Sequence, residues 1–361
     1  MNYELNLDQC ADLITAVPNN TMMLQGHMGV GKTSVAGLIH MKKPQHTVFY
    51  CDCTTKDLGD LTIPNIVQMD TATGYVTYLT NEELGLHLNE PIILMIDEYG
   101  KANPSVKLAL TRLMLERKMG SVTLHPDSIV FCTTNLGSEG VGDILPAHAR
   151  NRLTIVNVRK STAMEWITWG INNGIDHSVL SWAKDNEMIF QGFDQVRDPS
   201  DNPYIFHPAE QRTSFVTPRS LEKLSNIVKQ RHLIDEETLI AAACGTIGDR
   251  GGMDCIAHIK MSDQLPTRDS IKTDPMNAIV PKSASATCMV VFRSLATMDK
   301  EYITPWMTYL NRLDTEAQGM FANGVRTKKY QHQTLVMTNA KFSQFMRENQ
   351  YMFKADDTHN V

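Results

Sequence analysis

The sequence contains no apolar run long enough to cross a membrane, and its N-terminus, MNYELNLDQC, lacks a basic stretch followed by an apolar one. We therefore expect no signal peptide, no membrane anchor and a cytoplasmic location. Internal repeats and low-complexity tracts are also missing. The seven cysteines are odd in number and scattered, mostly within apolar runs, which favours reduced thiols over a disulfide framework. Cys51 and Cys53 form a C-x-C pair, but no second pair follows at ligand spacing, so buried strand residues are favoured over a metal site.

A strong charge of one sign is missing as well. The net charge is -6, and acidic and basic residues are mixed along the chain. The one basic cluster, RTKKYQHQ at 326–333, is more typical of a solvated face than of a nucleic-acid site. A hydrophobic fraction of 42% excludes a disordered chain, and 361 residues indicate two or three domains.

The N-terminal half alternates apolar strands with helices. The helices are predicted from KTSVAGLIHMK and from NPSVKLALTRLMLERK, and the sequence DTATGYVTYL predicts a β-hairpin between them. This alternation predicts a parallel sheet with helices on both faces, whose ligand binds beyond the carboxyl ends of the strands. The five predicted strands cover residues 21–25, 47–53, 91–98, 128–135 and 153–158.

From about residue 159 the pattern is helical. Four successive helices are predicted from STAMEWITWGINNG, HSVLSWAKDN, TPRSLEKLSNIVKQRH and DEETLIAAACGTIG, and the polar stretch 262–275 is predicted to be a linker. We therefore predict an α/β nucleotide-binding domain at 1–158, a helical domain at 159–265 and a mostly helical segment of unknown role at 276–361.

The stretch GHMGVGKT fits the pattern G-x-x-x-x-G-K-[ST], with a strand before it and a helix after it. Its glycines allow successive backbone N–H groups to point at phosphate oxygens, and the following helix adds its positive end. The lysine supplies charge for the β- and γ-phosphates, and the threonine a hydroxyl ligand for Mg²⁺. The predicted phosphate-binding residues are Gly26, His27, Met28, Gly29, Val30, Gly31, Lys32, Thr33 and Ser34.

Polar residues also end two later strands. IILMIDE places Asp97 and Glu98 after a buried strand, and FCTTN places Asn135 at the end of the next. We expect Asp97, with Thr33, to hold Mg²⁺ and Glu98 to orient and polarise the attacking water. An amide at Asn135 can hold the γ-phosphate or the water by a hydrogen bond. ATP and Mg²⁺ are therefore the expected ligands.

The run IDEYGKANPSVKLALTRLMLERKMGSVTLHPDSIVFCTTN resembles the MoxR branch of the AAA+ ATPases, and the stretch before it is similar to that family's insert in the second helix region. The resemblance covers roughly residues 20–262 and implies a P-loop NTPase sheet of about five strands, a helical AAA+ lid and a ring, usually a hexamer. Such a ring needs an arginine donated to the neighbouring subunit. In LPAHARNRLTIV the family position falls on Arg152, with Arg150 as the alternative. TPRSLEKL places Arg219 at the lid arginine expected to reach the γ-phosphate of its own subunit.

The resemblance further implies an ATP-driven chaperone that remodels a protein client, often one with a von Willebrand A-type domain. The architecture also resembles phage-encoded MoxR-like ATPases. Two other functions stay open from the sequence. One is a nucleic-acid motor of the McrB or helicase-loader type, and the other is a scaffold that hydrolyses ATP slowly, which the presence of Glu98 disfavours.

Overall fold

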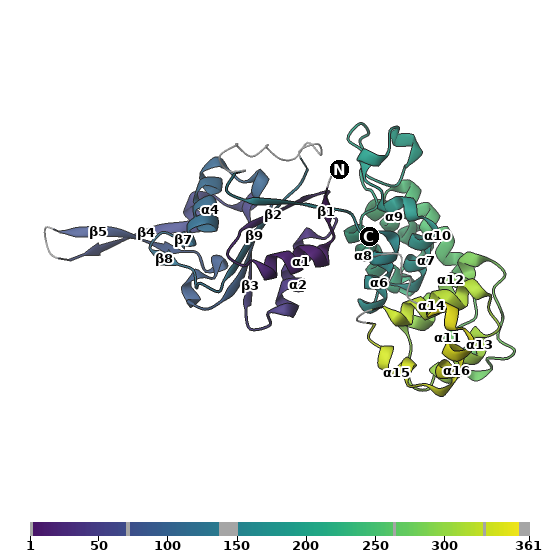
Figure 1. Cartoon of the computed structure of the whole chain (residues 1–361). Helices are drawn as coiled ribbons and strands as arrows, with labels where there is room; N and C mark the ends of the chain where they lie inside the picture. The colour runs from purple at the N-terminus through teal and green to yellow at the C-terminus, as the bar shows by residue number, and fades with distance from the viewer. Residues whose placement is uncertain (1–2, 70–72, 137–150, 263–264, 328–329, 354–361) are drawn as a thin grey trace. The chain divides into compact units, whose positions relative to one another are not determined.

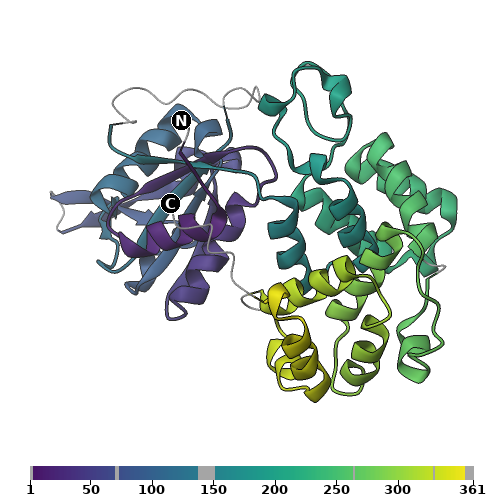
Figure 2. The ribbon, with the colours of Figure 1, turned by 45° about the vertical axis from the view of Figure 1, so that its right-hand side comes forward.

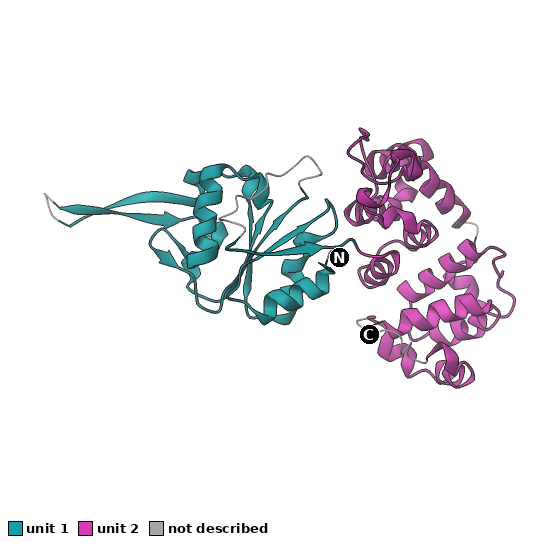
Figure 3. Cartoon of the chain, turned by 45° about the horizontal axis from the view of Figure 1, so that its top comes forward, with its two compact units in different colours: residues 1–160 teal, residues 161–361 magenta. Residues whose placement is uncertain are grey.

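The computed structural model describes residues 3–69, 73–136, 151–262, 265–327 and 330–353, and the chain divides into two compact units, 1–160 and 161–361 (Figure 3). The first unit is α/β and the second is helical. This arrangement confirms the predicted fold class, a helix-flanked parallel sheet followed by a helical part. The predicted division into three domains stays a prediction.

The sheet of the first unit has six strands, and every neighbouring pair is parallel. Its order is β1-β10-β2-β9-β6-β3, so the strand that leads into the glycine-rich loop, β2, lies inside the sheet. The strands are β1 (Glu4–Leu5), β2 (Met22–Gly26), β3 (Thr47–Asp52), β6 (Ile92–Asp97), β9 (Ile129–Thr134) and β10 (Thr154–Val158).

The five predicted strands are confirmed, each within one residue at either end. Two of them, β6 and β9, are buried along their whole length, as expected for continuous apolar runs covered on both faces. The sixth strand, β1, was not predicted. It is two residues long and is held by pairing with the edge of β10, which no local pattern reveals.

Helices cover both faces of this sheet (Figure 1). On one face, α1 (Leu7–Ala16) and α2 (Val35–Lys42) pack on alternate strand residues that include Ile93 and Met95. On the other, α4 (Pro104–Glu116) packs on the residues between them, including Leu94 and Ile96. This alternation follows from the two-residue period of a strand. It also fixes which face each polar residue at the strand ends points toward.

Two hairpins extend the first unit. In the longer one, β4 (Thr62–Gln68) pairs antiparallel with β5 (Gly74–Thr80), and this ribbon projects from the unit (Figure 1). The sequence predicted the hairpin within residues 70–79, but the first strand lies earlier, in TIPNIVQ, where a proline and alternating polar residues obscured it. The shorter hairpin joins β7 (Lys118–Met119) to β8 (Val122–Thr123), and Ser121 in its turn hydrogen bonds Thr77 of the ribbon.

The second unit has one apolar core, to which residues on both sides of the predicted linker contribute. Within 276–361, α12 (Ala284–Ala296) packs on α7 (His177–Asp185), and Trp306 and Phe321 are among the largest fully buried side chains. Figure 2 shows the green and yellow helices of this segment in the same unit as the teal ones. The described helices of the second unit are α6 (Ala163–Asn172), α7 (His177–Asp185), α8 (Pro218–Lys229), α9 (Glu236–Ile247), α10 (Asp249–Ser262), α11 (Arg268–Thr273), α12 (Ala284–Ala296), α13 (Ile303–Leu310), α14 (Thr315–Arg326), α15 (Gln333–Met337) and α16 (Ala340–Glu348).

Part of the stretch predicted as a linker is helical. Helix α11 begins after Thr267, whose hydroxyl accepts a hydrogen bond from Ser270 N, and Ile271 is fully buried in the core. The cap and one apolar anchor outweigh the polar composition that favoured a linker. Within the described parts of both units, no helix combines the length and apolar character needed to cross a membrane.

Candidate nucleotide site

The glycine-rich stretch forms a tight loop between β2 and the 3₁₀ turn Lys32–Ser34 that leads into α2. Gly29 and Gly31 have φ angles of 71° and 96°, in the left-handed region that side chains disfavour. At Gly26 the constraint is space, because a Cβ there would lie 2.7 Å from the carbonyl oxygen of Val158 on β10. The three glycines are therefore required by the shape of the loop.

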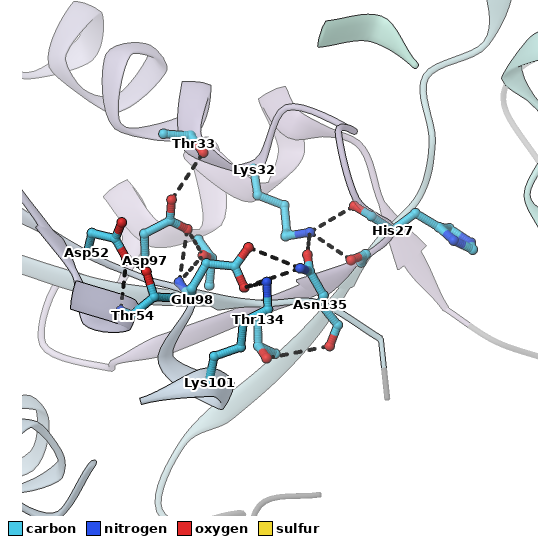
Figure 4. A network of polar contacts seen from close by, with 12 residues as sticks. His27, Lys32, Thr33, Asp52, Thr54, Asp97, Glu98, Lys101, Thr134 and Asn135 are labelled. Atoms are coloured by element: carbon cyan, nitrogen blue, oxygen red, sulfur yellow. Dashed lines mark hydrogen bonds and ion pairs between the residues drawn. The ribbon is translucent and has the colours of Figure 1, made fainter. Parts of the chain in front are cut away.

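Lys32 is a nearly buried lysine, with 7% of its surface exposed. Its Nζ donates hydrogen bonds to the carbonyl oxygens of Gly26 and His27, at 2.7 and 2.8 Å, and to Asn135 Oδ1 at 2.8 Å (Figure 4). A buried ammonium group needs such acceptors to offset the loss of water. The charge is thus held inside the curl of the loop, where phosphate oxygens would lie.

Asp97 ends β6 and faces α2, on the side of the sheet where Thr33 lies. The Thr33 hydroxyl is 3.4 Å from Asp97 Oδ2. The other carboxylate oxygen, Oδ1, accepts hydrogen bonds from the Thr133 hydroxyl and, at 3.1 Å, from the backbone N–H of Glu98. The Asp97 side chain is therefore fixed by the residue that follows β6 and by a residue of β9.

Glu98 follows β6 with a φ of 53°, a left-handed conformation that is uncommon for a residue with a side chain. Its carboxylate oxygens accept hydrogen bonds from Asn135 Nδ2 at 3.0 and 3.2 Å, and Oε2 is 2.9 Å from Lys101 Nζ (Figure 4). Strained backbone is concentrated at functional sites, where it aims a side chain that regular structure would misplace.

The strand order brings these groups together. Because β9 lies between β2 and β6, Asn135 at the end of β9 lies between the loop lysine and the acidic residues. Lys32, Asn135 and Glu98 form one continuous chain of hydrogen bonds, although Lys32 and Asn135 are 103 positions apart in the sequence. Asn135 itself is buried, so both ends of its amide are committed to these two partners.

The donor set at Thr33 and Asp97 fits Mg²⁺. Both groups are oxygen donors, one hydroxyl and one carboxylate, which are the ligands that this ion prefers over nitrogen or sulfur. Among the described residues, no group of three or more His, Cys, Asp and Glu side chains is arranged to hold a metal ion. A magnesium ion at this site would therefore depend on the nucleotide phosphates and on water for its other ligands.

Three buried cysteines, Cys51, Cys53 and Cys132, lie behind the site. Burial raises the pKa of Cys132 on β9, and the hydrogen bond that Cys53 shares with Cys51, together with burial, raises the pKa of Cys53. Cys51 and Cys53 both belong to the apolar cluster beneath α4, on the opposite face from Thr33. This placement is typical of packing residues.

The structure describes two of the three predicted arginines. Arg152 is exposed and lies two residues before the start of β10, at the opposite end of the sheet from the glycine-rich loop. Arg219 is exposed in the first turn of α8, in the second unit. Arg150 lies outside the described residues. The roles predicted for all three stay predictions.

Three contact residues of the site were not predicted: Tyr50, Lys101 and Thr133. Lys101 follows Glu98 by three positions, and Tyr50 lies on β3, which pairs with β6, but lysine and tyrosine are common on surfaces and carry no spacing pattern. Thr133 lies within FCTTN, two residues before Asn135, so its side chain points to the same side of β9 as that of Asn135. That alternation is the one feature of the sequence that could have identified it.

Comparison with solved structures returns proteins of low similarity to this chain. NtrX from Brucella abortus, crystallised in complex with ADP, is 14% identical with a TM-score of 0.38, over 98% of this chain and 70% of that one. The Thermotoga maritima RuvB Holliday junction branch migration motor is 14% identical with a TM-score of 0.36, over 82% of this chain and 86% of its own. At these values the likeness decides neither fold nor function. No protein-family model and no curated protein matches the chain.

Proposed function

We propose that this chain is an AAA+ P-loop ATPase of the MoxR type, which hydrolyses ATP between the subunits of a ring and uses the energy to remodel a protein client. The observation that carries the ATPase proposal is the hydrogen-bonded series from Lys32 through Asn135 to Glu98, with Thr33 and Asp97 beside it. A charged donor, an amide and a carboxylate held in this order can bind a triphosphate and activate a water next to it.

Each residue has a distinct task in this proposal. The loop N–H groups and Lys32 hold the phosphates, and Thr33 and Asp97 would hold Mg²⁺, which neutralises charge on the phosphate oxygens when it is bound. Glu98 accepts a proton from the attacking water, and Asn135 keeps its carboxylate aimed at that water. Lys101 Nζ lies 2.9 Å from Glu98 Oε2, and this ion pair helps to hold the carboxylate in place.

The position of Arg152 supports hydrolysis between subunits. Because Thr154 on β10 pairs with Met22 on β2, Arg152 is level with residue 20, six residues before Gly26. Six strand residues span about 20 Å. That distance is too great for the arginine to contact phosphates in its own loop, so a role at the γ-phosphate requires the site of a neighbouring copy. A ring, with six subunits as the usual number in the family, supplies such neighbours.

The β4–β5 ribbon supports a protein client, such as a von Willebrand A-type domain. Ile66 is 78% exposed, and residues 62–80 contain one charged residue, Asp70, and no lysine or arginine. Exposed apolar patches mark interaction surfaces, whereas nucleic-acid surfaces require positive charge. A nucleic-acid motor is the second candidate. The feature that favours it is the basic cluster at 326–333, which lies outside the ribbon.

The test of the ATPase proposal is the substitution Lys32→Ala. Loss of a charged hydrogen-bond donor is worth about 1.5–3 kcal/mol, so nucleotide affinity should fall by about 10- to 150-fold. Binding of a fluorescent ATP analogue and steady-state phosphate release measure the effect. Lys118→Ala, at an exposed lysine on β7, is the matched control and should behave as the unmodified chain. Equal affinity in the Lys32 variant and the control would overturn the proposal.

The two candidate partners are separated by adding each to the same ATPase assay. A permanently unfolded polypeptide, reduced and carboxymethylated α-lactalbumin, should raise the rate of hydrolysis if the client is a protein. Single-stranded DNA at low salt should leave the rate unchanged. Stimulation by the DNA that disappears as salt is raised would favour the nucleic-acid motor.

A further inference from the structure

A tyrosine hydroxyl contacts the carboxylate proposed to hold the metal. Tyr50 Oη donates a hydrogen bond to Asp97 Oδ2 at 2.8 Å, and Thr33 Oγ1 is 3.4 Å from the same oxygen. The atom of Asp97 that faces the proposed magnesium ligand Thr33 is therefore also the atom that Tyr50 holds.

The fold places Tyr50 at this position through strand pairing. Strand β3 runs parallel to β6, with Tyr50 opposite Met95 and Asp52 opposite Asp97. Met95 packs in the cluster beneath α1 and α2, so the Tyr50 side chain emerges on that same face, where Thr33 precedes α2. From there its hydroxyl reaches along the strand direction to Asp97, which lies two residues after Met95 at the carboxyl end of β6.

Hydrogen bonds account for both oxygens of Asp97. Oδ1 accepts from the Thr133 hydroxyl and from the N–H of Glu98, while Oδ2 accepts from Tyr50 and, over a longer distance, from Thr33. On the metal-facing oxygen, Tyr50 thus makes the shorter of these two contacts. Partners of this kind fix the rotation of a ligating carboxylate, and their loss typically lowers metal affinity by about 10- to 100-fold.

We propose that Tyr50 is a positioning residue that orients Asp97 for the Mg²⁺-bound nucleotide. This inference rests on the proposed ATPase function and adds a residue on β3 to that site. Tyr50 acts through Asp97, so its hydroxyl matters for the metal dependence of binding and not for contact of the phosphates with Lys32. Tyr50 is 47% exposed, so it contributes less to the core than a buried tyrosine does. A change to phenylalanine therefore removes the hydroxyl and leaves the packing in place.

The experiment compares Tyr50→Phe with Tyr75→Phe, which removes a hydroxyl from the exposed ribbon. Binding of a fluorescent ATP analogue is titrated over a series of free Mg²⁺ concentrations and in EDTA, and melting temperatures without metal check the fold. We expect unchanged affinity in EDTA for both variants. For Tyr50→Phe alone, the Mg²⁺ concentration that gives half of the metal-dependent gain in affinity should rise by about 10- to 100-fold. Its rate of hydrolysis should recover substantially at saturating Mg²⁺.

The outcomes separate this inference from the proposed function. If the unmodified chain does not bind the analogue, the ATPase proposal fails and the inference fails with it. If the unmodified chain binds with a clear Mg²⁺ dependence and Tyr50→Phe shows the same dependence, only the inference fails. A Tyr50→Phe variant that loses affinity equally in EDTA would also overturn it, because the hydroxyl would then act on the nucleotide or on the fold.

Discussion

Lys32 and Asn135, 103 positions apart in the sequence, are joined by a 2.8 Å hydrogen bond between Nζ and Oδ1. The same asparagine donates from Nδ2 to both oxygens of Glu98. One amide therefore connects the group proposed to hold phosphate with the group proposed to activate water. Removal of the Asn135 side chain takes an acceptor from Lys32 and a donor from Glu98. Because Asn135 is buried, water cannot easily replace either group.

We expect Asn135→Ala to lower the rate of ATP hydrolysis more than it lowers ATP affinity. Lys32 keeps two carbonyl acceptors in the variant, whereas Glu98 loses both of its amide contacts. A contact to a charged group is worth about 1.5–3 kcal/mol, so kcat should fall by about 10- to 150-fold. Steady-state kinetics measure kcat and KM separately. Asn20→Ala, at an exposed turn, is the control, and an affinity loss larger than the loss of kcat would contradict the assigned role.

The substitution Glu98→Gln should separate binding from turnover. The amide keeps the size of the side chain but cannot accept a proton, and a positioned general base contributes about 100- to 10,000-fold to a rate. We therefore expect ATP to bind with affinity close to that of the unmodified chain and hydrolysis to fall by about that factor. Glu116→Gln, at an exposed glutamate paired with Arg112, is the control. Unchanged turnover in the Glu98 variant would assign the base to another residue.

Much of this site follows from the sequence, because in a parallel sheet the carboxyl ends of all strands meet at one edge. That rule predicts that Lys32, Asp97 and Asn135 gather at one edge, although it assigns no contacts between them. The contacts depend on strand order: only with β9 between β2 and β6 does Asn135 bridge the other two strands. Strand order is set by packing between distant segments, and no local pattern encodes it. The Tyr50 contact depends on the β3–β6 register for the same reason.

The position of Arg152, at the end of the sheet opposite the glycine-rich loop, leads to a prediction about assembly. Arg152→Ala should lose activity, since an arginine supplied to the transferring phosphoryl group is worth about 10³- to 10⁵-fold. If Arg152 acts on a neighbour, mixing this variant with Lys32→Ala should restore some activity. In mixed rings some interfaces combine an intact loop with an intact arginine. Arg112→Ala, at an exposed arginine on α4, is the control.

The mixing experiment is read as rate against the ratio of the two variants at constant total protein. Activity that rises to a maximum at an intermediate ratio supports action between subunits. A rate that stays at the level of the separate variants at every ratio would contradict it. Arg150→Ala, tested in the same way, decides between the two arginines that the sequence left open.

The β4–β5 ribbon is apolar on both faces, which predicts a role in contact with the client. Ile66 pairs with Val76 on one face, and Ile63 pairs with Leu79 on the other, and all four side chains are exposed. A solvated ribbon with no bound partner would gain nothing from these residues, and such surfaces favour aggregation unless they have a use. The double substitution Ile66→Thr and Val76→Thr keeps the β-branched shape that a strand favours while it removes the apolar surface on one face.

We expect this double variant to retain its basal ATPase rate, because the ribbon contributes no residue to the nucleotide site. Stimulation by unfolded α-lactalbumin should fall to less than half of that seen with the unmodified chain. Leu108→Gln removes a comparably exposed apolar side chain from α4 and should leave the stimulation intact. Full stimulation in the double variant would assign client contact to another surface. A loss of basal rate would instead mean that the ribbon supports the site or the assembly of the ring.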